Sequence, residues 1–265
     1  MLEDAIKYKT IVDEFDEAIK AGEFKMYLQP QISAKTGKLT GAEALVRRIK
    51  PDGTIVSPID FIPVYENSGL ISRLDRYIWE QASAKLGEWK KAGINMKISV
   101  NISPKDFYYI DIFNTFVGLV KKYDIEPSNL KIEITETTIM SDVPNLMGEL
   151  EELRKAGFTL EMDDFGSGYS SLNTLKDINV DVLKIDMGFI KETKNVKKSR
   201  IILASVIKMA KELNLLIITE GGGETEEQVD NLTKLGCDVF QGYYFSKAID
   251  VKEFEKRYLY RKIAG

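Results

Sequence analysis

The chain has 265 residues, a formal net charge of −4 and a hydrophobic fraction of 44%, values typical of a globular protein with a packed core. It contains one cysteine, Cys237, and no histidine, which excludes intramolecular disulfides, Ser-His-Asp triads and histidine-based zinc sites. The net acidity argues against binding to a nucleic acid polymer. We therefore expect a cytoplasmic protein whose chemistry depends on carboxylates, amides and lysine.

Residues 1–22 are predicted to form an amphipathic helix, because apolar side chains such as Ile11, Phe15 and Ile19 recur at helical spacing. The remaining residues, 23–265, are expected to form one barrel domain. The most apolar stretch of the chain is interrupted by lysine and glutamate, so we expect no membrane insertion.

Short β-like runs then alternate with longer helical patterns, which predicts an α/β fold. One connection, Pro58–Lys91, is longer and contains two helical patterns separated by Ser68-Gly69. The expected architecture is a TIM-like (β/α)8 barrel, with allowance for one irregular or antiparallel strand. The eight strand-like runs are Phe24–Gln29, Leu39–Arg47, Lys97–Ile102, Leu130–Thr135, Phe158–Met162, Val182–Ile185, Leu216–Thr219 and Asp238–Gln241.

Polar side chains recur on one face of these strands. In a barrel strand, alternate side chains point inward, and the carboxyl ends of the strands form the face that carries the site. In Leu130–Thr135, for example, the isoleucines share one parity, so Glu133 should point into the barrel. The same argument places the following side chains inside or at the mouth: Glu43, Arg47, Ser99, Asn101, Thr135, Glu161, Asp163, Lys184, Asp186 and Glu220.

So many acids facing one another would repel unless cations neutralise them. Hard oxygen ligands without imidazole or thiolate favour Mg²⁺ or Mn²⁺, with Ca²⁺ as a further binder that we expect to inhibit; zinc is disfavoured. The adjacent pair Asp163-Asp164 suits two ions, because one carboxylate can contact both. Two such ions can activate water against a phosphodiester without histidine.

The residues carry a recognisable set of blocks. Glu43-Ala44-Leu45-Val46-Arg47 resembles the signature of the EAL-domain cyclic di-GMP phosphodiesterases, and the resemblance runs from about Phe24 to the C-terminus. Further blocks that look like the family, in order, are Tyr27-Leu28-Gln29-Pro30, Phe61-Ile62-Pro63 with Glu66, Ser99–Ser103, Glu133–Glu136, Asp163–Leu172, Lys184-Ile185-Asp186, Glu220-Gly221 and Gln241-Gly242-Tyr243.

This resemblance implies roles for individual residues. Lys184 would position or deprotonate the attacking water, and Glu136 would anchor the loop that starts at Asp163. The region around 163–172 is also implied to form a homodimer. The implied metal ligands are Glu43, Asn101, Glu133, Asp163, Asp164 and Glu220; the implied catalytic residues are Lys184, Glu43, Glu220 and Glu136; the implied substrate-binding residues are Gln29, Arg47, Asp186 and Gln241.

The implied reaction is hydrolysis of cyclic di-GMP to 5′-pGpG in bacterial second-messenger signalling, with an upstream sensory or cyclase domain as a further expected partner. The chain departs from the family at Gly221–Gly223, where one extra residue displaces Glu224. An alternative is therefore an impaired domain that binds cyclic di-GMP as a receptor. An interaction module is a third interpretation, but it predicts decay of the carboxylate ring, which is not seen.

Overall fold

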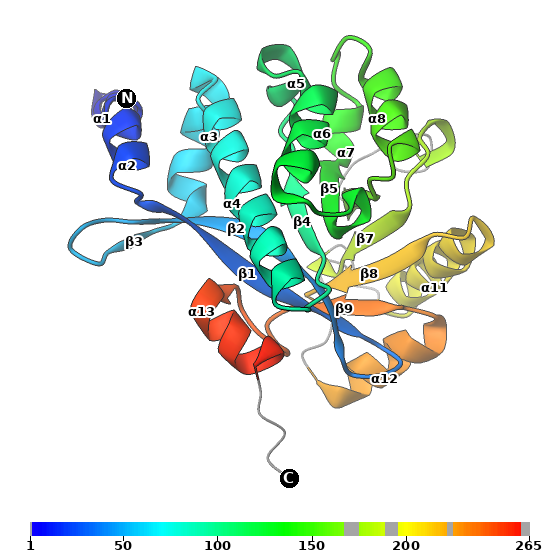
Figure 1. The fold of residues 1–265 in the computed structure, drawn as a ribbon. Helices are drawn as coiled ribbons and strands as arrows, with labels where there is room; N and C mark the ends of the chain where they lie inside the picture. Colours follow the sequence, from blue (N-terminus) through cyan, green and yellow to red (C-terminus); the bar gives the residue numbers. More distant parts are fainter. Residues whose placement is uncertain (1, 167–174, 189–195, 222–224, 261–265) are drawn as a thin grey trace.

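The computed structural model describes residues 2–166, 175–188, 196–221 and 225–260. Its strands form one sheet in which β1 pairs with β2 on one side and with β9 on the other, closing eight strands into a barrel (Figure 1). Two short strands, β3 (Ile55–Val56) and β10 (Ile249–Asp250), pair at its edges. The barrel strands are β1 (Phe24–Ser33), β2 (Leu39–Ile49), β4 (Ile98–Asn101), β5 (Leu130–Thr135), β6 (Leu160–Phe165), β7 (Val182–Asp186), β8 (Leu216–Glu220) and β9 (Val239–Gln241).

All eight predicted strands are confirmed, although β1 extends to Ser33 and β6 begins only at Leu160. The expected antiparallel strand is β1. It joins β2 through a connection of only a few residues, which suits a hairpin, whereas a parallel pair needs a crossover of about a dozen residues or more. From β2 through β9, neighbouring barrel strands are parallel.

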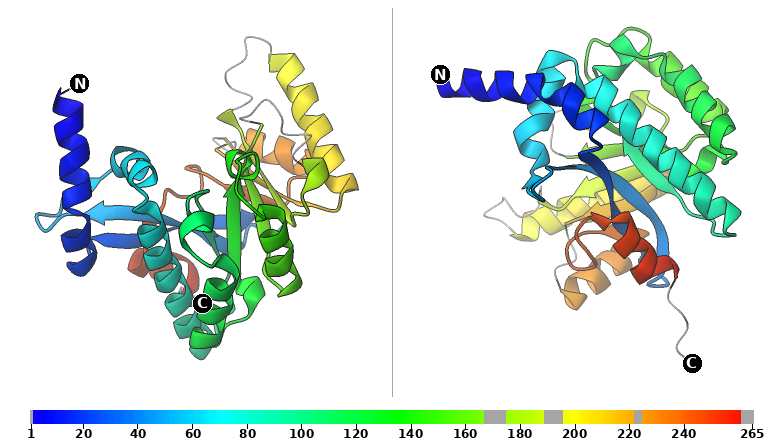
Figure 2. Two further views of the ribbon diagram at one scale, coloured as in Figure 1. Left: turned by 90° about the horizontal axis from the view of Figure 1, so that it is seen from above. Right: turned by 60° about the vertical axis from the view of Figure 1, so that its left-hand side comes forward.

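Helices surround the barrel (Figures 1 and 2). The long connection between β3 and β4 forms two helices, as predicted, and Gly69 ends the first in a left-handed conformation (φ 77°). No helix within the described residues has the length and apolarity needed to cross a membrane. The helices after the N-terminal region are α3 (Pro58–Ser68), α4 (Ile71–Lys91), α5 (Asp106–Tyr109), α6 (Ile112–Tyr123), α7 (Glu136–Ile139), α8 (Leu146–Lys155), α11 (Val196–Glu212), α12 (Glu226–Leu235) and α13 (Val251–Phe254), with a 3₁₀ turn at Pro127–Asn129 and a π turn at Glu255–Leu259.

Most of the hydrophobic core lies between the strands and the helices. In β5, Ile132 and Ile134 are fully buried in a cluster that includes Trp79 and Phe116 of the surrounding helices. Because side chains alternate along a strand, the residues between these isoleucines face the barrel interior. The apolar shell leaves the mouth of the barrel to polar groups, while a small separate apolar cluster of Val182, Ile218 and Val239 shares the inward-facing parity of Lys184, Glu220 and Gln241.

The N-terminal region forms α1 (Leu2–Asp13) and α2 (Phe15–Lys20), and the views in Figure 2 show it extending away from the barrel. It is attached through a buried arginine: Arg48 on β2 lies 2.7 Å from Glu14 and 2.9 Å from Glu23. A cluster of aromatic rings, including Phe15 and Tyr65, packs beside these ion pairs. A domain division at residue 22 stays a prediction.

Arg48→Met should lower the free energy of unfolding by about 2–4 kcal/mol, because it leaves Glu14 and Glu23 without their mostly buried partner. Arg73→Met is the matched control, since the Arg73–Asp16 pair joins the same region but is more than half exposed. Arg73→Met should lower the free energy of unfolding by about 1 kcal/mol or less. Urea unfolding of both variants measures the difference, and equal losses would contradict the importance of the buried pair.

A candidate active site at the mouth of the barrel

One buried lysine lies among four carboxylates at the mouth of the barrel. The ammonium nitrogen of Lys184 is 2.5 Å from Glu133, 3.0 Å from Glu220, 3.2 Å from Asp163 and 3.3 Å from Glu43. The four acids come from β5, β8, β6 and β2, so the closed barrel brings together residues that are far apart in the sequence. A single positive charge cannot neutralise four carboxylates, and the site keeps an excess of negative charge.

Two amide side chains complete the ring. Gln241 on β9 donates a short hydrogen bond to Glu43 and a second, of 3.1 Å, to Glu220. Asn101 on β4 donates to the other oxygen of Glu43 at 3.1 Å. The two oxygens of Glu43 are therefore both engaged, which fixes the orientation of this carboxylate.

The consecutive acids Asp163 and Asp164 both reach the site because β6 is irregular at this point. Asp164 has a left-handed backbone conformation (φ 57°), and the register with β7 shifts between Met162 and Phe165. Such a bulge breaks the alternation that would otherwise send neighbouring side chains to opposite faces. Ligand oxygens of Asp163, Asp164 and Glu220 consequently lie within 4.8 Å of one another.

Burial shifts the proton affinities of this cluster. Desolvation, followed by the charges of neighbouring acids, raises the pKa of Glu133 and of Glu220 well above the usual range for a carboxyl group. Desolvation acts in the opposite direction on Lys184, but the surrounding carboxylates outweigh it and raise the pKa of the ammonium group. The shifts are those expected of acids that face one another without enough cations.

The donor set fits hard divalent cations. Among the described residues, neither carboxylate oxygen of Glu133 accepts a hydrogen bond, although both are buried and one is ion-paired with Lys184. The converging groups are carboxylate and amide oxygens, with no sulfur or imidazole, which is the ligand type of Mg²⁺ and Mn²⁺. The part of the chain described by the structure therefore has both the charge and the ligand chemistry for such ions.

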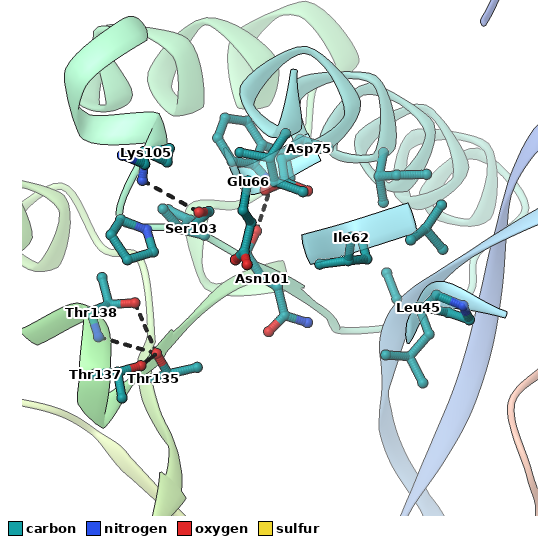
Figure 3. Close-up of a pocket in the computed structure, with 18 of the residues that line it drawn as sticks. Leu45, Ile62, Glu66, Asp75, Asn101, Ser103, Lys105, Thr135, Thr137 and Thr138 are labelled. Atoms are coloured by element: carbon teal, nitrogen blue, oxygen red, sulfur yellow. Dashed lines mark hydrogen bonds between the residues drawn. The ribbon is translucent and has the colours of Figure 1, made fainter. Parts of the chain in front are cut away.

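A cavity of about 580 Å³ opens beside the carboxylate ring, and Asn101 belongs to both. Its walls come from β2, α3, α4 and the segment after β4; Figure 3 shows Leu45, Ile62 and Glu66 around it. The cavity combines an apolar wall with convergent polar groups, as ligand sites usually do. It is open enough to admit a small organic ligand next to the acids.

A pair of acids lies at the wall of this cavity: Asp75 lines it, and its neighbour Asp106 is fully buried. Asp75 on α4 lies beside Asp106 on α5, which accepts a hydrogen bond of 2.8 Å from the backbone of Ser103. Desolvation, with the charge of Asp106, raises the pKa of Asp75 far above its ordinary range, and desolvation raises the pKa of Asp106 to about 6. Burial therefore favours the protonated form of both carboxyl groups.

The remaining predicted site residues are also placed at the mouth. Arg47 lines the cavity, its guanidinium lies 5.9 Å from the ring centre of Tyr27, and burial lowers its pKa. Gln29 accepts a hydrogen bond from Gln241 at 3.4 Å, and Asp186 accepts one from the backbone of Gly188. Glu136 is buried at the start of α7. Glu224 and residues 167–172 of the loop lie outside the described residues.

Sequence reasoning missed a second polar layer beneath the ring. Lys131 on β5 is 2.5 Å from Glu161 on β6 and 3.0 Å from the side-chain oxygen of Gln31 on β1. Glu161 was predicted to face inward, but without a partner. Lys131 shares its parity with Glu133, so the same alternation would have placed it inside the barrel.

The chain belongs to the EAL domain family: a family model described as EAL domain matches residues 12–248. It is 37% identical to the signaling protein YkoW of Bacillus subtilis over 240 residues, which are 91% of this chain and 30% of that protein. It is 31% identical to the cyclic di-GMP phosphodiesterase PA2567 of Pseudomonas aeruginosa over 247 residues, 93% of this chain and 42% of that protein. The chain thus spans roughly a third of the length of these relatives.

A solved structure described as the PaMucR phosphodiesterase in complex with c-di-GMP superimposes with a TM-score of 0.85 at 31% identity, covering 92% of this chain and 99% of that one. The EAL enzyme Bd1971, bound to cAMP and cyclic di-GMP, gives a TM-score of 0.86 at 31% identity, covering 95% of this chain and 69% of that one. The expected family and barrel fold are both confirmed.

Lys184→Met should destabilise the protein by about 3–5 kcal/mol, because it leaves four clustered carboxylates without their cation. Lys211→Met is the control: Lys211 is paired with Asp238 but is 39% exposed, so its loss should cost about 1 kcal/mol or less. Chemical unfolding without added divalent cations measures both values. If Lys184→Met lowers the free energy of unfolding no more than Lys211→Met does, the central position assigned to Lys184 is contradicted.

Asp106→Asn tests the acid pair through the pH dependence of stability. A raised pKa means that the folded protein binds this proton more tightly than the unfolded chain, so the stabilisation is complete below pH 3.8 and is lost as the pH rises to about 6. The wild type should lose up to about 3 kcal/mol relative to the variant across this window. Urea midpoints of both proteins, measured against pH, give this difference in stability. A difference that does not change with pH would refute the raised pKa of Asp106.

Proposed function

We propose that this chain hydrolyses one phosphodiester bond of cyclic di-GMP to give 5′-pGpG, in bacterial second-messenger signalling, with two Mg²⁺ or Mn²⁺ ions. The observation that carries the proposal is the carboxylate ring around Lys184, with Asp164 beside it and a ligand-sized cavity adjoining it. The excess negative charge attracts cations, and cations in turn attract an anionic phosphodiester that the acidic ring alone would repel.

Six residues would hold the ions. Glu43, Asn101, Glu133 and Asp163 form one set, while Asp163 and Asp164 form the second, with Glu220 within reach of both aspartates. When bound, such ions lower the pKa of a water ligand towards about 7 and stabilise charge on the phosphoryl oxygens. Ca²⁺ prefers longer and more numerous oxygen contacts, so we expect it to bind and inhibit.

Within this ring, the ammonium group of Lys184 would hold the four carboxylates through its ion pairs and orient the attacking water. Glu220 is the most exposed of its four partners, with 21% of its side chain accessible, and is the carboxylate best placed to accept a proton from that water. Asn101 and Gln241 hold the Glu43 carboxylate in one orientation, with its lone pairs directed at the proposed metal position. Glu136, buried at the turn after β5, supports the loop that begins at Asp163.

We assign the substrate contacts to residues at the mouth of the barrel. Arg47 faces the cavity next to the ring and can pair with a phosphate through its planar guanidinium group. Asp186 and Gln241 are the last residues of β7 and β9, and Gln29 lies within β1 beside Gln241; the three would orient the ribose and phosphate groups. Support comes from relatives of about 31% identity: PA2567 is named a cyclic di-GMP phosphodiesterase, and PaMucR was solved in complex with c-di-GMP.

The proposal extends to the cellular setting. We infer that the chain works in the cytoplasm joined to a sensory or cyclase domain, since curated relatives such as MucR, named as a bifunctional cyclase and phosphodiesterase, are longer than the matched region. A homodimer through the region around 163–172 also remains a proposal. The second candidate function, a cyclic di-GMP receptor without turnover, is favoured only by the altered Gly221–Gly223 sequence after β8.

Purified protein with Mn²⁺ should convert cyclic di-GMP to pGpG, and Glu43→Ala should lower turnover by at least about a thousandfold, because it removes a carboxylate from the centre of the ring. Chromatographic quantification of the product measures this. Glu126→Ala, at a site whose side chain is 72% exposed, is the control and should retain wild-type turnover.

The same measurement separates the alternatives. If the protein binds cyclic di-GMP tightly but yields no product, the receptor function replaces the proposed hydrolysis. If it shows neither binding nor product, the interaction module is the interpretation that stays. Unchanged turnover in Glu43→Ala, with the fold intact by circular dichroism, would overturn the assigned mechanism.

A further inference from the structure

We propose that Gln31 and Lys131 form a positioning relay that fixes the side-chain amide of Gln241 with its N–H groups towards Glu43 and Glu220. The relay lies in the second polar layer, beneath the carboxylate ring. Its consequence for turnover rests on the proposed function of the ring. Neither Gln31 nor Lys131 contacts the proposed ligand positions, so both act through Gln241.

The relay is a continuous chain of side-chain contacts across the barrel. Lys131 donates to the oxygen of the Gln31 amide at 3.0 Å, and the nitrogen of that amide donates to the oxygen of Gln241 at 3.0 Å. The nitrogen of Gln241 then donates to Glu43 and Glu220. The chain thus begins at a buried ammonium group and ends at two carboxylates of the ring.

The chemistry of the two ends sets the direction of every bond between them. An ammonium group has only donors, so Lys131 requires the oxygen of Gln31 and turns its nitrogen towards Gln241. Ionised carboxylates have only acceptors, so Glu43 and Glu220 require the nitrogen of Gln241. Both glutamines therefore have one orientation that satisfies both ends of the chain, and loss of either end removes part of the constraint on Gln241.

Packing confines the central member of the relay. Gln31 is 1% exposed and Gln241 is 3% exposed. A β-carbon on Gly41 would lie 2.9 Å from the side-chain oxygen of Gln31 and 3.2 Å from the carbonyl oxygen of Lys97. The glycine on β2 thus provides the space that this amide occupies, and no bulkier residue fits there without displacing it.

The charge of Lys131 is balanced within its own layer. Glu161, fully buried, lies 2.5 Å from the ammonium group, and the charges of Lys131 and Lys184 hold its pKa low despite desolvation. The pair therefore adds no net charge beneath the ring. Lys131 contributes orientation through Gln31, while the negative excess of the ring stays available for cations.

Without the relay, Gln241 could rotate by half a turn and present its carbonyl oxygen to Glu43 and Glu220. That orientation places like partial charges together and removes two donors from the carboxylates. Because Glu43 also accepts from Asn101, loss of the Gln241 donor would leave it held on one side only. The carboxylates would then sample orientations that do not suit the reaction.

Gln31→Met tests the relay, because it removes the amide at similar length and leaves the Lys131–Glu161 pair in place. We expect kcat to fall about fivefold to tenfold, as for the loss of one buried hydrogen bond, with KM little changed. The decisive comparison is a double-mutant cycle with Gln241→Met. Gln31→Met should have no further effect on kcat in the Gln241→Met background, whereas independent effects that multiply would overturn the relay.

A spectroscopic readout tests the same point without turnover. The side-chain amide signals of Gln241, identified by their disappearance in Gln241→Met, should shift and lose protection from hydrogen exchange in Gln31→Met. Gln81→Met is the matched control: Gln81 bonds only to backbone groups of β1 in the described structure, so its loss should lower stability and leave those signals unchanged. Unchanged Gln241 signals in Gln31→Met would refute the relay.

These readouts distinguish the two proposals. If the wild type yields no product, the proposed function fails, while the amide signals still decide whether the relay exists. If Gln31→Met does not fold, the paired variant Lys131→Met with Glu161→Gln removes the donor to Gln31 together with its counter-charge. It should produce the same change in the Gln241 signals, and their persistence would overturn the relay.

Discussion

The structure depends on one electrostatic constraint: a single ammonium group, Lys184, faces four carboxylates inside a closed barrel. Water cannot screen charges that are this deeply buried, so the attraction of the lysine is offset by strong mutual repulsion of the acids. The barrel maintains this arrangement because its apolar shell lies outside the strands. The mouth of the barrel is thus free to concentrate charge that a hydrophobic centre would exclude.

Much of this could be predicted from the sequence, because strand alternation is a local property. Placing Glu133, Asp163 and Lys184 inside the barrel required only the parity of their apolar neighbours. Parity alone would have separated Asp163 from Asp164. Their shared position depends on the left-handed backbone at Asp164, which alternation does not reveal.

The second polar layer was less accessible to sequence reasoning for a different reason. Parity indicates which side chains face inward but not how deep along the barrel axis each one lies. Gln31 is 100 residues from Lys131 and 210 residues from Gln241 in the sequence, and the three meet only through the register of an antiparallel strand. Depth and register are properties of the closed sheet, so no local pattern specifies them.

The reversed direction of β1 has a consequence for how the barrel could be controlled. Phe24, the first residue of β1, pairs with Arg48 near the carboxyl end of β2, so the N-terminal helices join the barrel on the face that carries the carboxylate ring. Lys7 of α1 also forms an ion pair with Asp60 of α3, whose residues Ile62 and Glu66 line the cavity. A rotation of the N-terminal helices would therefore act directly on the residues that line the cavity, without a change in the rest of the barrel.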